Sequence, residues 1–388
     1  MKMKNHVFIL LCVCAGLIIC SCSDFSAASS GSTGAELDSS AESRQKHQKQ
    51  AASNAFSAKL KIVAWNAETF FDAQTDGLEY SEFKKSSAGW GREAYIQRLD
   101  RLCEVIKALD ADVVALEEIE NAGIIYDISN RLAGNAWQKN KIYDYACFAR
   151  EKGSSIGCAV LSRHLISGVK VHSLKIKTEK DKQPAMRPVM EVEIFAGGRT
   201  LSLFVNHWKS MSGGEDETEI WRKWEESVLA HCFAKLDENA SGLACGDFNR
   251  NIEKFSICSG LSEYVPLNSK ISGDVVVNQN SAGNKVNVLL NYVFPKSEND
   301  CTPDSGAVGV YSPWILENGS VIPTGSYYYN ESWNYLDHFF SYGCAKIISF
   351  NTEKNGAWAD ENGIPLGYKI YTGGGYSDHL PVSCIVCF

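Results

Sequence analysis

The chain has 388 residues, of which 45% are apolar and 22% are charged, and both proportions are average for globular proteins. This composition excludes a wholly disordered, fibrous or multi-span membrane protein. The formal net charge of −8 provides no general attraction for nucleic acid, so a phosphate-binding site would need local cations or a metal ion.

Residues 1–21 have the pattern of an export signal. Lys2 and Lys4 precede an apolar run over 7–19, which is too short to span a bilayer comfortably. Ser21 and Cys22 then resemble the cleavage site of bacterial lipoproteins, where a small residue precedes a lipidated cysteine. We therefore expect acyl chains on Cys22 to anchor the protein to a membrane of the bacterial cell envelope, on the periplasmic or the surface-exposed face. An ordinary cleaved signal peptide is the alternative.

The composition changes again after the signal. Residues 22–58 are mainly Ser, Ala, Gly and Gln with scattered charges, and they show neither a helical nor a strand period, which predicts a flexible tether. No linker-like stretch divides the rest, so we expect one domain over 59–388.

Ten of the fourteen cysteines fall in this domain. Export would permit disulfides there, and the sequence does not specify their pairing.

Strands outnumber helices in the predicted domain. Apolar residues at helical spacing predict helices over 92–109 and 217–236. Short apolar runs predict strands at 60–65, 112–116, 156–161, 189–195, 201–205, 243–245, 336–340 and 380–386. This mixed order fits neither a strictly alternating βα barrel nor a plain sandwich of strands. Residues 250–335 are rich in Asn, Ser, Gly and Tyr, and we expect long loops there.

Polar side chains recur at the ends of these apolar runs. A single carboxylate after a strand usually caps a turn and would carry little weight. Six clusters at six strand ends are a stronger signal, because they could converge on one edge of a pair of sheets. The clusters are Asn66, Glu117 with Glu118, Asn206 with His207, Asp247 with Asn249, Asp337 with His338, and Asp378 with His379.

In this order, the segments around the clusters resemble the motifs of the endonuclease/exonuclease/phosphatase superfamily, which has the DNase I-like fold. The segments are VAWN at 63–66, DVVALEEIEN at 112–121, NHWKS at 206–210, GDFN at 246–249, LDH at 336–338 and SDHLPV at 377–382. The resemblance covers nearly all of 59–388. It implies an α/β fold, a four-layered α/β/β/α sandwich of two mixed sheets flanked by helices, with the site at one edge. Glu117 departs from the pattern, since many members have Gln there.

The resemblance implies that the protein hydrolyses phosphate esters with a bound divalent metal ion. A hard cation on oxygen ligands neutralises charge on the phosphate, and the implied ligands are Glu118, Asn66 and Asp378. Mg²⁺ is the favoured ion, with Mn²⁺ and Ca²⁺ as alternatives, because all three prefer oxygen. Arg187 would contact the phosphate through its planar guanidinium.

The same resemblance implies a catalytic set around a histidine. His379 would be the general base, and Asp337 would fix its orientation. Asp247 and Asn249 would position the attacking water and the phosphate. His207 would donate to a phosphate oxygen as negative charge develops there.

Three functions are compatible with these residues. The leading one is a nuclease for DNA and/or RNA at the cell envelope, with nucleic acid and the membrane as partners and no implied protein partner. A lipid phosphodiesterase or phosphatase, similar to sphingomyelinases or phosphoinositide phosphatases, would need an apolar segment for membrane contact, which could lie within 259–325. A non-enzymatic adhesion lipoprotein is the third, against which stands the retention of every catalytic-type residue.

Two local patterns leave alternatives open. His338 would point away from Asp337 if both lie in a strand, so we expect it outside the site. Three successive tyrosines at 327–329, followed by Trp333, could stack on nucleobases or could pack alternate rings within a strand.

Overall fold

The computed structural model of the protein describes residues 58–134, 142–173, 183–237, 239–257, 308–316 and 320–388, with three short strands between 266 and 290. The expected signal, Cys22 and all but the last residue of the expected tether lie outside this part. Within the described residues, no helix combines the length and apolar character needed to cross a bilayer. The cysteines that the structure describes are all free thiols.

The first sheet has six strands, in the order β17-β18-β1-β2-β4-β3. Its strands are β1 (Lys59–Phe70), β2 (Val113–Ile119), β3 (Tyr145–Ala149), β4 (Gly157–Ser162), β17 (Lys346–Thr352) and β18 (Val382–Cys387). Strands β1 and β2 are parallel and the other neighbours are antiparallel, so the sheet is mixed. The parallel pair brings the carboxyl ends of both strands, with Asn66 and Glu118, to one edge.

The second sheet has eight strands, in the order β5-β6-β7-β8-β16-β13-β12-β9. Its strands are β5 (Leu165–His172), β6 (Val189–Ala196), β7 (Arg199–His207), β8 (Ser241–Asp247), β9 (Ser256–Ile257), β12 (Asn287–Leu290), β13 (Val308–Tyr311) and β16 (Asp337–Gly343). Among the described strands of this second sheet, only β7 and β8 are parallel neighbours, and His207 pairs with Asp247 at their carboxyl ends. Two hairpins stand apart from the sheets: β10 (Pro266–Leu267) with β11 (Ser269–Lys270), and β14 (Tyr327–Tyr329) with β15 (Ser332–Asn334).

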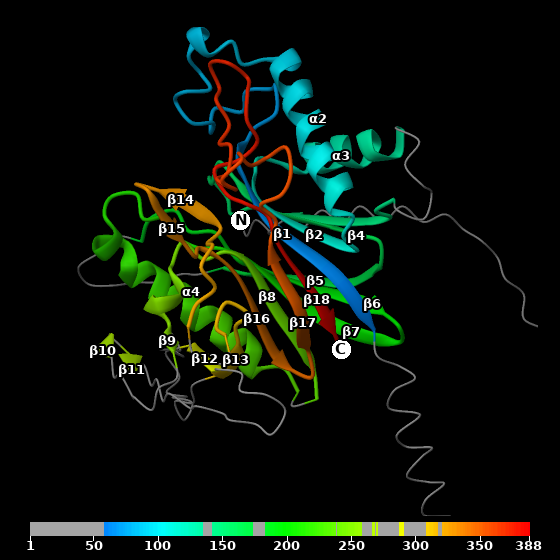
Figure 1. The fold of residues 1–388 in the computed structure, drawn as a ribbon, viewed down its shortest axis with the longest axis vertical. Helices are drawn as coiled ribbons and strands as arrows, with labels where there is room; N and C mark the ends of the chain where they lie inside the picture. The colour runs from blue at the N-terminus through cyan, green and yellow to red at the C-terminus, as the bar shows by residue number, and fades with distance from the viewer. Residues whose placement is uncertain are drawn as a thin grey trace, which may run out of the picture.

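Helices cover the outer faces of the two sheets (Figure 1). Helices α2 (Arg92–Leu109) and α3 (Ala122–Gly134) pack on the first sheet, and α4 (Glu215–Ala234) packs on the second. Two short 3-10 helices, η1 (Ser86–Ala88) and η3 (Ile252–Lys254), lie in the connections. The predicted four-layered α/β/β/α sandwich is therefore confirmed.

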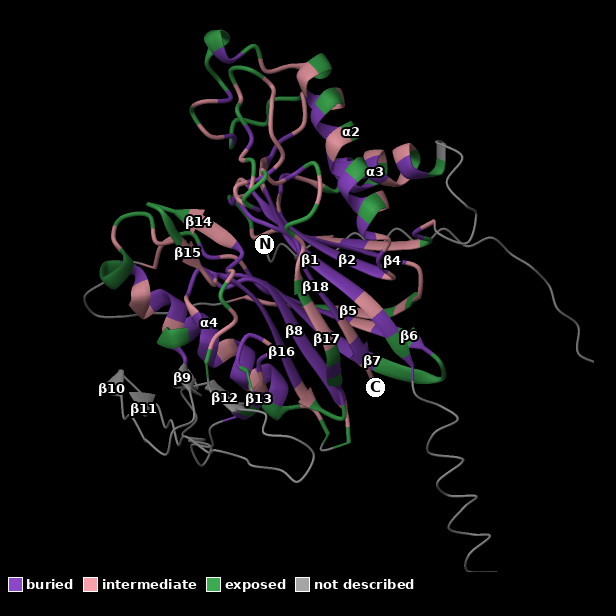
Figure 2. Cartoon of the chain, in the orientation of Figure 1, coloured by how far each residue is buried: buried purple, intermediate pink, exposed green. Residues whose placement is uncertain are grey.

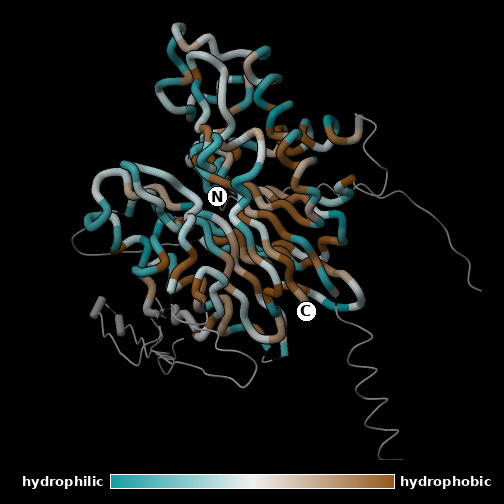
Figure 3. The backbone as a smooth tube through the Cα atoms, viewed as in Figure 1, coloured by the Kyte–Doolittle hydropathy of each residue, from teal (hydrophilic) through white to brown (hydrophobic). Residues whose placement is uncertain are grey.

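Strand β1 shows why its sequence is almost continuously apolar. Side chains alternate between the two faces of a strand, and both faces of this strand are covered. Ile62 and Ala64 join the core between the sheets, whereas Val63 and Trp65 join the core beneath α2 and α3. Figure 2 shows this burial along both sheets, and Figure 3 shows the matching concentration of hydrophobic residues.

The backbone departs from regular geometry where the polar clusters begin. Glu68, Thr69, Glu118 and Asn249 have positive φ angles of 52°, 48°, 61° and 46°, which are unfavourable for residues with a Cβ atom. Gly246 has a φ of 118°, and a Cβ there would lie 2.1 Å from the carbonyl oxygen of Asn206. Strained backbone of this kind is concentrated at functional sites in proteins, and here it marks one edge of the sandwich.

Candidate active site

Side chains from both sheets meet at this edge. Asn66 from the first sheet donates through Nδ2 to Asp247 Oδ2 of the second sheet at 3.0 Å, and it contacts Glu118 Oε1 at 3.4 Å. His207 Nε2 lies 3.5 Å from Glu118 Oε1 and 3.8 Å from Asp247 Oδ2. The convergence expected from the strand ends is therefore present for these four residues.

A histidine and a carboxylate form the next part of the site. His379 Nδ1 lies 2.8 Å from Asp337 Oδ2, and its Nε2 lies 4.0 Å from Asp247 Oδ2. Asp337 is the first residue of β16 and pairs with Asp247 in the neighbouring strand β8. The Ser326 hydroxyl donates to the same Asp337 oxygen at 2.6 Å. Asp337 is thus held from two sides and fixes one ring nitrogen of His379.

Asn249 and Asp247 are linked by the turn that follows β8. The Asn249 backbone N–H donates to Asp247 Oδ1 at 2.7 Å, and its side-chain Nδ2 donates to Asp247 Oδ2 at 2.9 Å. Nδ2 also lies 3.2 Å from the carbonyl oxygen of Trp208, which it approaches as a donor. Both side chains are therefore rigid, and they are almost fully buried.

The edge carries more negative than positive charge. Burial raises the pKa of Asp247 to about 7, with His379 opposing and Asp337 adding to the rise. Burial raises the pKa of Asp378, with His379 opposing the rise and Glu118 adding to it. Burial by itself would lower the pKa of His379, but Asp337, Asp247 and Asp378 raise it well above 6.5. Burial lowers the pKa of His207 well below 6.5, so this ring is neutral.

These carboxylates fit a hard divalent cation. Burial is the main cause of the raised pKa values of Asp247 and Asp378, neighbouring acids add to the rise, and a bound cation would favour the charged forms. The Glu118 side chain is 16% exposed, against 2% for Asp247. Asn66 turns Nδ2 toward both carboxylates, while its Oδ1 accepts from the Glu68 N–H at 2.9 Å. Glu118 and Asp247 therefore offer the oxygens that face the centre of the cluster.

Arg187 lies beside this cluster and is partly buried. Its Nη1 donates to the carbonyl oxygen of Trp208 at 3.1 Å, the same oxygen that Asn249 approaches. It also hydrogen bonds to Tyr80, whose pKa is raised mainly by burial and further by Glu118. The guanidinium is thus a cation at the rim of an acidic site.

Several neighbours have structural roles. His338 is buried, its Nε2 lies 2.8 Å from the Arg250 carbonyl oxygen, and its ring stacks on Phe340. It thus lies on the opposite side of β16 from Asp337, as its register predicts. Asp76, Glu79 and Glu120 form an acidic group, but Glu79 and Glu120 accept backbone N–H groups of turns.

Sequence analysis missed two residues that support the site. Glu68 Oε2 accepts from the backbone N–H groups of Tyr368 and Asp378, at 2.7 and 2.9 Å. Burial and the charge of Asp378 raise the pKa of Glu68 to about 7. Its position two residues after Asn66, at the end of a strand, was the available signal. The second residue, Arg98, lies on the apolar stripe of helix α2, three residues after Tyr95 and four before Leu102, and a charge at such a position was the available signal.

A buried histidine oriented by a carboxylate, beside clustered acids at the edge of a double sheet, is an arrangement that can support hydrolysis of a phosphate ester with a bound cation. A model of the Endonuclease/Exonuclease/phosphatase family matches residues 61–280, which is more than half of the chain. The chain belongs to this family, and it is accordingly a metal-dependent phosphodiester hydrolase. A search of curated proteins found no match.

The chain is similar in fold to solved structures, which include the following three. A humanised D. rerio TDP2 has 15% identity and a TM-score of 0.46, with 84% of this chain and 98% of that chain covered. The human Nocturnin catalytic domain has 14% identity and a TM-score of 0.45, with coverage of 84% and 94%. An endonuclease/exonuclease/phosphatase from Bacteroides vulgatus has 13% identity and a TM-score of 0.44, with coverage of 85% and 98%.

Proposed function

We propose that the protein is a metal-dependent nuclease that hydrolyses phosphodiesters of DNA and/or RNA at the bacterial cell envelope. The observation that carries this proposal is the His379–Asp337 pair, whose free ring nitrogen faces the Asp247 carboxylate 4.0 Å away. This arrangement offers a base held in one orientation beside acids that can hold a cation and a water.

His379 would take a proton from the attacking water through Nε2. Its Nδ1 is occupied by Asp337, so Nε2 is the nitrogen available for this step. The Asp337 carboxylate stabilises the imidazolium that forms. Asp247 lies against Nε2 and would hold the water there, while Asn249 fixes the Asp247 carboxylate through two hydrogen bonds.

The phosphate would lie between Glu118 and the second sheet. A divalent cation held by Glu118, with Asp247, Asn66 and Asp378 nearby, supplies charge neutralisation and orients the phosphate. His207 is neutral and can donate a hydrogen bond to a non-bridging oxygen without bringing charge. Arg187 reaches the same side from the Trp208 carbonyl and suits a second phosphate oxygen.

The β14–β15 hairpin supports nucleic acid over lipid as substrate. Tyr328 packs against Trp333 on one face, and Tyr327 and Tyr329 stack on the other with ring centroids 6.2 Å apart. The Tyr327 ring in turn lies 4.8 Å from the His379 ring, and Tyr329 is 59% exposed. This row of rings leads from solvent to the proposed base and is suited to stacking nucleobases beside the scissile phosphate.

Assays of the purified full-length protein on single-stranded DNA, RNA and sphingomyelin vesicles test the proposal. We expect hydrolysis of one or both nucleic acids, complete loss of this activity in excess EDTA, and recovery when Mg²⁺ is restored. Sphingomyelin should remain intact. Cleavage of sphingomyelin without cleavage of nucleic acid would favour the lipid phosphodiesterase, and inactivity on all three would favour an adhesion protein.

A matched control removes the contribution of contaminating nucleases. The His379→Ala variant, purified in the same way, should lack the activity while retaining the wild-type thermal unfolding profile. Equal hydrolysis by both preparations would assign the activity to a contaminant.

The location is a separate part of the proposal and rests on the signal-like residues 1–21. Cys22→Ala should move the protein from the membrane fraction to the soluble fraction, because acyl chains on Cys22 would be its anchor. Fractionation and Triton X-114 partition measure this, with Cys344→Ala as a control that leaves the anchor intact. Detergent-phase partition of Cys22→Ala would refute lipid anchoring.

A further inference from the structure

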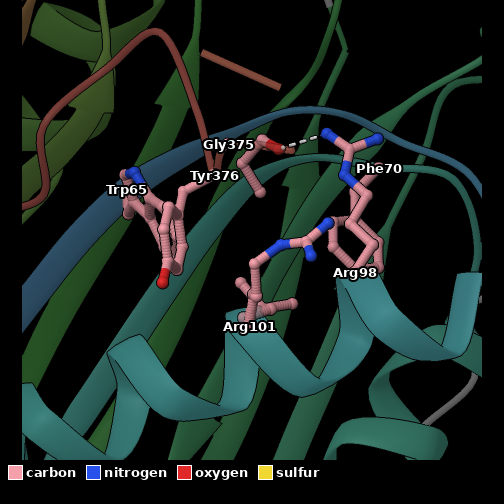
Figure 4. Close-up of a pocket in the computed structure, with 8 residues that line it drawn as sticks. Trp65, Phe70, Arg98, Arg101, Gly375 and Tyr376 are labelled. Atoms are coloured by element: carbon pink, nitrogen blue, oxygen red, sulfur yellow. Dashed lines mark hydrogen bonds between the residues drawn. The ribbon is translucent and has the colours of Figure 1, made fainter. Parts of the chain in front are cut away.

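Arg98 is a buried cation that reaches from helix α2 to the turn at the end of β1 (Figure 4). Only 2% of the surface of Arg98 is exposed. Nη1 donates to the carbonyl oxygen of Thr69 at 3.0 Å, and Nη2 donates to the carbonyl oxygens of Ala67, at 3.1 Å, and Glu68. One guanidinium therefore binds three successive carbonyl groups.

Two of these three residues, Glu68 and Thr69, hold the proposed metal ligands through their N–H groups. The Glu68 N–H donates to Asn66 Oδ1 at 2.9 Å, and the Thr69 N–H donates to Glu118 Oε2 at 2.6 Å. Glu68 and Thr69 both have positive φ angles, a strained conformation that persists only where surrounding contacts impose it. The Arg98 contacts are of that kind, because they fix all three carbonyls of the turn.

Arg98 also joins the turn to the segment that carries Asp378. The guanidinium carbon lies 3.7 Å from the centroid of the Tyr368 ring, and the Tyr368 N–H donates to Glu68. Glu68 accepts from the Asp378 N–H through the same oxygen. Arg98 thus contacts the residues whose backbone or side chain holds Asn66, Glu118 and Asp378, either directly or through one intervening residue.

We propose that Arg98 is a positioning residue that sets the geometry, and hence the metal affinity, of the Asn66–Glu118 ligand pair. The inference rests on the proposed function only through the assignment of the metal to these residues. Groups that orient metal ligands typically change metal affinity by about 10–100-fold when they are replaced. Lysine keeps the charge of arginine but lacks the fork that binds several carbonyls.

The test compares Arg98→Lys with Arg101→Met. Arg101 follows Arg98 by one helical turn and lines the same small cavity, but its guanidinium donates to the carbonyl oxygen of Gly373 instead of the carbonyls of the turn. Isothermal titration of the full-length protein with Mg²⁺ and with Mn²⁺ gives the Kd, and thermal unfolding reports folding. We expect Arg98→Lys to raise the Kd at least about 10-fold, and Arg101→Met to leave it within about twofold.

The alternative is an arginine that serves the core alone. In that case Arg98→Lys would lower the unfolding temperature and leave the Kd within twofold of wild type, which would overturn the proposal. If Arg98→Lys does not fold, Arg98→Gln is the second variant, because Gln is uncharged and lacks the fork that binds several carbonyls. A Kd within twofold of wild type for that variant would also overturn the proposal.

Two further measurements separate this inference from the nuclease proposal. Glu118→Gln should abolish the titration signal, which identifies the measured site as this one. A wild-type protein that binds metal there but cleaves no nucleic acid would refute the nuclease proposal and leave the role of Arg98 intact.

Discussion

Glu118→Gln is expected to lower kcat/KM for nucleic acid by about 10²–10⁴-fold, the factor that corresponds to losing several kcal/mol of metal-derived charge stabilisation. The change keeps the volume of the side chain and removes its charge. It also places an NH₂ group against a donor, since Thr69 N–H donates to Oε2 and Asn66 Nδ2 approaches Oε1. Raised Mg²⁺ should recover part of the activity, which titration of initial rates against Mg²⁺ measures.

Glu117→Gln is the matched control for this variant. Glu117 is fully buried, neither carboxylate oxygen has a hydrogen-bond partner among the described residues, and burial raises its pKa well above the usual value. Burial therefore favours the uncharged acid at this position, and Gln is uncharged and of the same size. We expect activity within a few-fold of wild type. An equal loss in both variants would contradict a specific role for Glu118.

His379→Ala and Asp337→Ala should each lower kcat by about 10²–10⁴-fold, the range for a positioned general base. The double variant should lose little more than the worse single variant, because the two side chains act as a unit through one hydrogen bond. Single-turnover rates on purified, folded protein measure these effects. Strictly multiplicative losses would contradict the coupled pair. His338→Ala is the control, and it should cost stability but leave kcat of the folded protein near normal.

The same pair has a pH signature. A base works only when it is unprotonated, so a raised pKa of His379 moves the acidic limb of the pH–rate profile above the usual value for histidine. Asp337 is one of the charges that raises this pKa. Asp337→Asn should therefore shift the limb to lower pH while the plateau falls, and a pH series of kcat/KM checks the direction.

Much of the fold follows from the sequence because its apolar runs are buried on both faces. The helix over 92–109 has the predicted bounds, and α4 begins and ends two residues before the predicted helix. Helix α3 and strands β3, β5 and β17 were missed. Strands β9 to β13 lie within 250–335, where long loops were expected, and three of them belong to the second sheet. Strand β5 has no buried residue, and the outward residues of β17 include Ile348, which is 54% exposed, so neither shows a clear inward face.

The central site could be predicted because its residues follow strand ends, and parallel neighbours bring such ends together. Its supports could not, for a physical reason. Arg98 binds backbone carbonyl groups. Every residue has such a group, so the sequence does not indicate which residues Arg98 contacts. Arg98 lies on the buried stripe of α2, between Tyr95 and Leu102. This position indicates that the side chain is buried, but it does not indicate the turn that the guanidinium binds.

The site takes its residues from both sheets and from both ends of the domain. Asn66 lies in the first strand of the described chain, whereas His379 lies just before the last strand. A chain growing from its N-terminus would hold Asn66 and Glu118 long before residue 379 has been made. The site therefore cannot be complete until residue 379 has been made, and a fragment that ends before His379 lacks the proposed base.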